Sequence, residues 1–333
     1  YRPAIHFING EYWGLIEIRE RIDRFFVASH QNADPDDVAI LTNDAIVEEG
    51  DESDALDFVA LREYVASHDM TDPAHYAWAA ARMDMENFVA YNVGHIFART
   101  LDWPHNNIRV WRVGQGPWHW VFYDFDSAFG LPIEEYGENT LARATRQAGE
   151  QDWSTVMLRQ LLKNPEFQNR FIALMVDHLN TSFHPERMTE ILNEMHRVLE
   201  PYYPEHVERW PNTISTSKEV MQGFVLVRPA HVREHLADYF DLEPARPLSI
   251  RTASGELGTV TVNGTPITIA SPGVRVDGGT LLWEGYFFPG LPAEITAIAK
   301  PGYEFVGWVE IPNSNEATLM VDVAEQTELT ALF

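Results

Sequence analysis

Two short polar segments decide the fold: LDWPHNNI at residues 101–108 and YDFDSAFG at residues 123–130. The first places a carboxylate, Asp102, and an amide, Asn107, in a loop that precedes a predicted strand. The second contributes two further carboxylates, those of Asp124 and Asp126. Acidic and amide oxygens that meet at adjacent strand ends suit Mg²⁺ and the phosphates of a nucleotide.

A β-hairpin is predicted between these segments. Residues 108–113 and 119–123 read as strands, and Gly114-Gln115-Gly116-Pro117 joins them. The hairpin would carry Asp124 and Asp126 to the end of its second strand, and this strand-end position favours Asp124 as the principal metal ligand. The residues alone do not decide between the two.

The spacing matches the way in which protein kinases arrange their phosphate chemistry. Asn107 follows Asp102 by five positions, as the metal-binding Asn follows the catalytic Asp of a kinase, and the next hairpin ends near Asp124. An alternative stays open, because Asp and Asn in turns often bond only to their own backbone.

The rest of the chain combines helices and strands. Asn9-Gly10 between two apolar runs predicts a hairpin, and the acidic stretch 48–57 predicts a solvated loop or a helix start. Helical spacing covers 73–101, with Asp84 as a cap, and four later stretches: 156–162, 167–179, 187–199 and 220–240.

Composition changes at residues 243–247, where two prolines indicate a linker. Short alternating runs then predict a small module of antiparallel strands packed on Phe305 and Trp308. The predicted class is therefore α+β, with a helix-rich domain at 1–243 and an all-β module at 248–333.

Composition excludes several kinds of partner. The 333 residues are 45% hydrophobic and carry a formal net charge of −26, which argues against nucleic acid and anionic membranes. No run of 18 apolar residues predicts a membrane span. Cysteine is absent, so disulfides and thiolate chemistry are excluded, whereas the compartment is left open.

Several ordered motifs resemble the spore-coat protein H (CotH) kinase family of secreted, atypical protein kinases. They are FINGEYWGL at 7–15 with Arg19-Glu20, Asp102-Trp103 with Asn107-Ile108, Asp124-Phe125-Asp126 with Phe129-Gly130, and a later tract with His206–Trp210, Phe224 and Arg228-Pro229. The resemblance spans about 1–243. It implies an atypical kinase-like fold that uses ATP and Mg²⁺ to phosphorylate Ser or Thr of an exported protein.

The resemblance also implies roles for individual residues. Asp102 would orient the acceptor hydroxyl and take its proton, while Asn107 and Asp124 would hold Mg²⁺. Asp126 would be a second metal ligand or support the first. Residues 15–18, which include Glu17, would cover the adenine.

Glu20 is a further cofactor-binding candidate on the same grounds. It would either contact the nucleotide or pair with an arginine, and the residues do not exclude the second role. Asn9 and Gly10 are required by the turn whether or not anything binds there.

One departure from the kinase pattern concerns lysine. A kinase grips the nucleotide phosphates with a lysine of its N-terminal lobe, but the lysines here are Lys163, Lys218 and Lys300. We expect that the N-terminal lobe is incomplete and continues upstream of Tyr1, or that an arginine such as Arg2 substitutes poorly. On this expectation the fragment is inactive alone, any export signal lies upstream, and the protein is extracellular or at the cell surface.

The β-module resembles internalin-type B repeats over about 249–333, which implies a spacer or adhesion role. Two rival functions remain open at this stage. The protein could be a non-catalytic coat or adhesion protein on a kinase-like scaffold, or a carboxylate-paired hydrolase or Ca²⁺-binding structural protein. Nucleotide binding, calcium binding and the sequence before Tyr1 would distinguish them.

Overall fold

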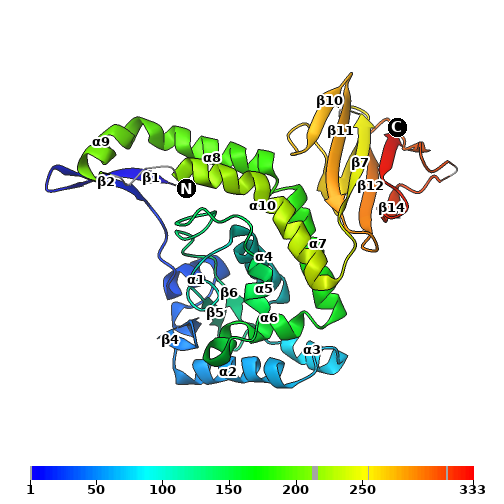
Figure 1. Cartoon of the computed structure of the whole chain (residues 1–333). Coiled ribbons are helices and arrows are strands. Elements are labelled where there is room, and N and C mark those ends of the chain that lie inside the picture. Colours follow the sequence, from blue (N-terminus) through cyan, green and yellow to red (C-terminus); the bar gives the residue numbers. More distant parts are fainter. Residues whose placement is uncertain (1, 212–216, 254, 313) are drawn as a thin grey trace. The chain divides into compact units, whose positions relative to one another are not determined.

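The computed structural model describes residues 2–211, 217–253, 255–312 and 314–333. The chain divides into two compact units. Unit 1 holds Tyr1–Leu174 and Ile191–Phe224, and unit 2 holds Met175–Glu190 and Val225–Phe333. Helices and sheets occur together, which confirms the α+β class (Figure 1).

The elements that belong wholly to unit 1 are β1 (Pro3–Ile8), β2 (Glu11–Glu17), α1 (Arg24–Gln31), η1 (Pro35–Asp37), β3 (Val38–Thr42), β4 (Ile46–Glu49), α2 (Glu52–Ser67), α3 (Pro73–Ala80), α4 (Met85–Ala98), β5 (Arg109–Val113), β6 (His119–Trp120), α5 (Thr140–Thr145), η2 (Gly149–Ser154), α6 (Val156–Leu161), η3 (Glu200–Tyr202) and α9 (Tyr203–Arg209). Three further helices have residues in both units: α7 (Pro165–Asn180), α8 (Pro185–Leu199) and α10 (Ser217–Phe240).

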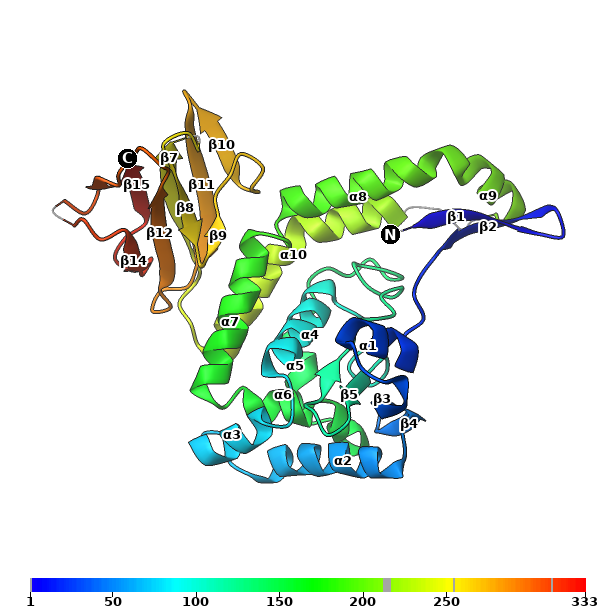
Figure 2. The ribbon, with the colours of Figure 1, turned by 180° about the vertical axis from the view of Figure 1, so that it is seen from behind.

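The N-terminal hairpin forms where the sequence predicts it. Asn9 and Gly10 have φ angles of 52° and 83°, the left-handed values that a two-residue type I′ turn requires. The hairpin lies beside α9 (Figure 2), and the backbone N–H of Leu15 donates to Nδ1 of His206 at 3.1 Å. These contacts fix the hairpin against a helix that is far away in the sequence.

A four-stranded antiparallel sheet, in the order β4-β3-β5-β6, positions the candidate site of unit 1. β3 pairs with β5 over five residues, from Val38 opposite Val113 to Thr42 opposite Arg109. Ile40 is completely buried in this sheet. The loop that contains Asp102 and Asn107 ends directly at β5, so the sheet anchors one side of that loop.

The second strand of the predicted hairpin is shorter than expected. β6 covers only His119–Trp120, whereas the sequence predicts a strand over 119–123. The N–H of Val121 still donates to the carbonyl of Arg109 at 3.0 Å, and the pairing ends there. Asp124 therefore lies beyond the strand, and the strand-end argument that preferred it over the second aspartate is wrong.

The strands of unit 2 are β7 (Arg246–Ala253), β8 (Gly258–Val262), β9 (Thr265–Pro266), β10 (Val274–Asp277), β11 (Thr280–Phe287), β12 (Ala293–Ala299), β13 (Gly307–Trp308), β14 (Thr318–Val321) and β15 (Glu328–Leu332). They form two sheets, in the orders β10-β11-β7-β15-β13 and β14-β12-β8-β9, which are coloured yellow to red in Figure 1. The prediction of a β-rich module is confirmed for the described residues. Trp308 is buried and its ring contacts Phe305, as expected.

Two details of this module differ from the prediction. β15 pairs with β7 in parallel, because residues 328–330 lie beside 249–251 in the same direction, whereas only antiparallel strands were expected. The predicted linker at 243–247 is also partly wrong, since α10 ends at Phe240 and β7 already begins at Arg246. Pro247 is the second residue of its strand, near the end, where a missing N–H is tolerated.

Within unit 2, the end of α7 binds the backbone of β11. The Asn180 side chain donates to the Tyr286 carbonyl at 3.0 Å and accepts from the Tyr286 N–H at 2.9 Å. β10 pairs with β11 only as far as Trp283, so Asn180 supplies backbone partners beyond that point.

Asn180→Ala is therefore expected to destabilise unit 2 by about 2 to 3 kcal/mol, because two backbone groups lose their partners. Urea unfolding followed by far-UV circular dichroism measures the change. Asn193→Ala, at an exposed position of α8, is the matched control and should change the stability little. Equal stability of both variants would show that the Asn180 contact contributes nothing.

Candidate active site

The loop 101–108 begins where α4 ends. Arg99 caps α4 in the left-handed conformation, with φ 54°. Two backbone hydrogen bonds then join this region to the segment 121–130: Leu101 N–H donates to Ser127 at 2.9 Å, and Phe129 N–H donates to Ala98 at 2.9 Å. The neighbours of these bonded residues in the chain include Asp102 and Asp126. The backbone therefore brings the two polar segments side by side.

The other end of the loop is attached to the sheet. Asn43, which follows β3, donates its backbone N–H to the Ile108 carbonyl at 2.8 Å and its side-chain amide to the Asn106 oxygen at 3.2 Å. Asn107 lies between these contacts with φ 58°, a left-handed value that Asn tolerates better than most residues. This geometry explains why an asparagine suits position 107 structurally.

Asn107 is 6% exposed, yet its side chain makes no hydrogen bond with any other residue that the structure describes. Among the described residues, the amide atoms of Asn107 do not belong to the fully buried polar atoms that lack a partner, so the amide reaches solvent and is open to a ligand.

The carboxylates of Asp102, Asp124 and Asp126 are exposed. Within the described ranges they make no ion pair and no side-chain hydrogen bond. Asp124 has φ 60°, so its backbone is in the left-handed region as well. Carboxylate and amide oxygens are the ligand types of a hard-oxygen cation site, and the metal-binding role of these residues stays a prediction.

His, Cys, Asp and Glu alone do not build a metal cluster here. In the part of the chain that the structure describes, no three of these residues form a group that could hold a metal ion. The metal site predicted from the sequence also includes the amide of Asn107. The metal-binding roles of Asn107, Asp124 and Asp126 stay predictions.

A partly buried arginine, Arg143, holds the beginning of the loop. Arg143 of α5 donates to the carbonyls of Thr100 at 2.7 Å and Leu101 at 2.9 Å. Glu138 is 3.0 Å from Arg99 and 3.3 Å from Arg143, so one carboxylate balances two guanidinium groups. Burial lowers the pKa of Arg143, and Glu138 opposes this shift. The loop start is thus fixed by charge-assisted contacts.

Aromatic side chains of both segments stack on one buried ring. His95 of α4 is fully buried and stacks nearly parallel on Trp103, at 4.9 Å and 7°, and on Phe125, at 4.8 Å and 14°. Phe122 also stacks on His95, at 5.3 Å. Burial lowers the pKa of His95 to about 3, so its ring is neutral at pH 7.

This pKa predicts a pH effect on stability. The unfolded chain binds a proton at His95 below its ordinary pKa of about 6.5, while the folded chain does so only near 3, so stability falls as the pH is lowered between these values. At pH 4.5 the expected loss from this residue is about 2 to 3 kcal/mol. Urea unfolding at pH 7 and pH 4.5 measures it, and His95→Phe should remove this part of the pH dependence. The same pH dependence in both proteins would contradict the assignment.

The remaining cofactor-binding candidates lie near the N-terminal hairpin. Glu17, at the end of β2, forms an exposed ion pair with Arg19 at 2.6 Å. Glu20 follows β2 and is 3.9 Å from His30 of α1. Neither makes a hydrogen bond or ion pair with the loop 101–108 within the described ranges, and their nucleotide contacts stay predictions.

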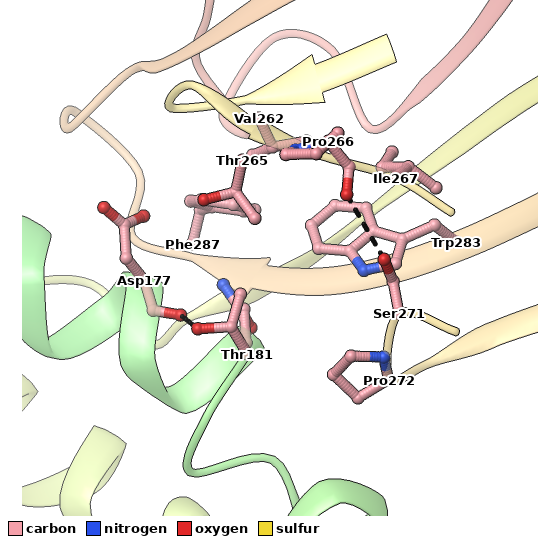
Figure 3. A pocket seen from close by; sticks show the side chains of 11 residues that line it. Asp177, Thr181, Val262, Thr265, Pro266, Ile267, Ser271, Pro272, Trp283 and Phe287 are labelled. Carbon is pink, nitrogen blue, oxygen red and sulfur yellow. Dashed lines mark hydrogen bonds between the residues drawn. The ribbon is translucent and has the colours of Figure 1, made fainter. Parts of the chain in front are cut away.

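Two cavities close to buried aromatic rings are too small for a nucleotide. One lies in unit 1, is lined by Trp103, Asn92 and Trp120 among others, and has a volume of about 30 Å³. The other lies in unit 2 and has a volume of about 20 Å³, and Asp177 of α7, Thr181 just after this helix and Trp283 of β11 are among its lining residues (Figure 3). Each has room for about one water molecule.

The chain combines an α+β fold with two polar segments that backbone hydrogen bonds hold together. The sequence model of the CotH kinase protein family matches residues 1–232, so the chain belongs to the CotH kinase family. This confirms the resemblance read from the motifs. No curated protein matches the chain. None of the described helices combines the length and apolar character needed to cross a bilayer.

Sequence reasoning missed the residues that support the site. A single histidine in an apolar helix gave no signal that His95 would contact both loops. Arg143 and Glu138 follow the second segment at a distance that implies no particular pairing. Which charged groups become buried depends on the fold and is not visible in the local sequence.

Proposed function

We propose that this protein is a Mg²⁺-dependent protein kinase that transfers the γ-phosphate of ATP to Ser or Thr of an exported protein. The observation that carries the proposal is the pair of backbone hydrogen bonds that join residues 98–101, at the start of the first polar loop, to residues 127–129. It is supported by the CotH kinase family match. ATP and Mg²⁺ are the cofactors that this family suggests.

Each polar residue has a distinct role in this proposal. Asp102 is exposed and unpaired, so it is available to orient an acceptor hydroxyl and to receive its proton. Asn107 and Asp124 would hold Mg²⁺ by their side-chain oxygens, with Asp126 as a further ligand. A bound magnesium nucleotide supplies charge neutralisation at the phosphates. The contribution of the chain is positioning, because phosphoryl transfer needs little covalent work from the protein.

The location and the partner follow from the same family. A spore-coat family favours a protein at the cell surface or outside the cell, and its phosphoacceptor is proposed to be an exported protein. The resemblance of the β-module to internalin-type repeats stays a prediction, with a spacer or adhesion role.

A test uses the complete gene product that contains this chain. It is incubated with γ-labelled ATP, Mg²⁺ and a mixture of exported proteins, and labelled Ser and Thr are identified by mass spectrometry. Asp102→Asn should lower the labelling at least about 100-fold, as expected for loss of a general base. Equal labelling by both proteins would refute the catalytic role of Asp102.

A non-catalytic scaffold function is the second candidate. It is favoured by one observation, namely that no lysine precedes Asp102 in this sequence. Absence of a thermal shift of the complete gene product with ATP and Mg²⁺ would support the scaffold function over the kinase function.

A further inference from the structure

The buried ring of His95 contacts aromatic side chains of both candidate loops. It stacks on Trp103, which follows Asp102 in the chain, and on Phe125, which lies between Asp124 and Asp126. Each loop therefore presents to His95 an aromatic residue that is a direct neighbour of a candidate catalytic or metal-binding carboxylate.

The two ring nitrogens of His95 differ in their hydrogen bonding. Nδ1 lies 3.0 Å from the Thr100 hydroxyl, and this contact orients the ring. Nε2 is buried and has no hydrogen-bond partner among the described residues. An unpaired buried nitrogen costs about 1 to 3 kcal/mol, which a phenylalanine at this position would avoid.

The hydrogen bonds across the loops depend on the same region. The Leu101 N–H donates to the Ser127 carbonyl, and the Phe129 N–H donates to the Ala98 carbonyl. Ala98 and Leu101 precede the stacked Trp103 in the chain, and Ser127 and Phe129 follow the stacked Phe125. Removing the ring would leave a cavity between Trp103 and Phe125, and the surrounding side chains would relax into it. A shift of about 1 Å in either loop is enough to disturb an arrangement whose function is positioning.

We propose that His95 is a positioning residue: its aromatic ring, stacked on Trp103 and Phe125, sets the placement of Asp102 relative to Asp124 and Asp126. This inference rests on the proposed function, because it assigns His95 a task in that same site. It goes beyond the motifs, which do not include position 95.

Two variants separate the ring from its hydrogen bond. His95→Phe keeps an aromatic ring and loses the contact with Thr100, whereas His95→Asn keeps a short amide near Thr100 and loses the ring. The first readout is amide hydrogen exchange of Leu101 and Phe129 in the metal-free chain. The second is Mn²⁺ affinity, measured by electron paramagnetic resonance with the metal alone.

We expect His95→Asn to exchange at least tenfold faster at Leu101 and Phe129 and to bind Mn²⁺ at least tenfold more weakly. His95→Phe should stay within threefold of wild type in both readouts. The Ile40 amide, in the sheet of the same unit, should be unchanged in both variants, which distinguishes local displacement from general loosening.

Three results would overturn the inference: wild-type behaviour of His95→Asn, equal losses in both variants, or faster exchange of Ile40 to the same extent as Leu101. Failure of the proposed function has a different signature. If wild type binds no Mn²⁺, the metal site is refuted, and the positioning role in catalysis falls with it, while the exchange rates still show whether His95 joins the two loops.

Discussion

Asp124→Asn is expected to lower phosphate transfer by the complete gene product about 10³-fold, equivalent to about 4 kcal/mol of transition-state stabilisation. The variant loses one negative charge where a divalent cation would bind. Its backbone should be unaffected, because Asn tolerates the φ angle of 60° at this position. Initial rates with γ-labelled ATP, at several Mg²⁺ concentrations, measure the effect.

Asp241→Asn is the matched control for this prediction. Asp241 is also an exposed aspartate with a left-handed backbone, φ 54°, but it lies at the end of α10. It should retain the wild-type rate. The same measurement on Asp126→Asn identifies the principal ligand as the residue whose loss is larger. Wild-type rates for both Asp124→Asn and Asp126→Asn would exclude metal binding by this segment.

Arg112→Met is expected to cause the largest loss of stability in unit 1. Arg112 of β5 is 3% exposed and pairs with Asp54 at 2.7 Å and Asp57 at 2.6 Å, while its guanidinium lies over Trp118 at 4.6 Å. The substitution leaves Asp54 largely buried without its partner. We expect a loss of about 3 kcal/mol, in which Asp57 counts little because water can solvate it.

Urea unfolding at pH 7 measures this loss. Arg24→Met is the control, because Arg24 pairs with Asp36 on the surface of the same unit, with much more solvent around both groups. Its removal should cost less than about 1 kcal/mol. Similar losses in both variants would mean that burial of the Arg112 pairs adds nothing to their strength.

Local signals predicted much of the secondary structure. The Asn9-Gly10 turn forms as expected, and Asp84 caps α4 by accepting from the N–H of Asn87. The acidic stretch 48–57 proves to be a helix start, since Asp51 and Asp54 form a capping box at α2. These features depend on a few neighbouring residues, so a single sequence is enough to show them.

Features that depend on distant partners were not predictable. Nothing near Arg112 in the sequence indicates Asp54, and the parallel pairing of β7 with β15 joins residues that are almost 80 positions apart. The end of β6 was misplaced for a related reason. Alternation continued to Tyr123, but the side chain of Phe122 belongs to the stack around His95 instead of a strand.

In the candidate site, too, the local sequence pattern was predictable and the long-range contacts were not. The identities and spacing of Asp102, Asn107, Asp124 and Asp126 predicted a polar site, and several ordered motifs together predicted the family, which the family model confirms. Their support was not visible in the sequence, because the contacts of His95 exist only once the chain has folded.

The most direct test of the central claim is the position of Mn²⁺ in crystals of the complete gene product soaked with Mn²⁺ and a non-hydrolysable ATP analogue. Anomalous scattering locates the metal without assumptions about its ligands. The account predicts a peak within coordination distance of the Asn107 amide oxygen and of a carboxylate of Asp124 or Asp126, with Asp102 facing the terminal phosphate. A metal peak away from these side chains, or none in crystals that contain the analogue, would contradict it.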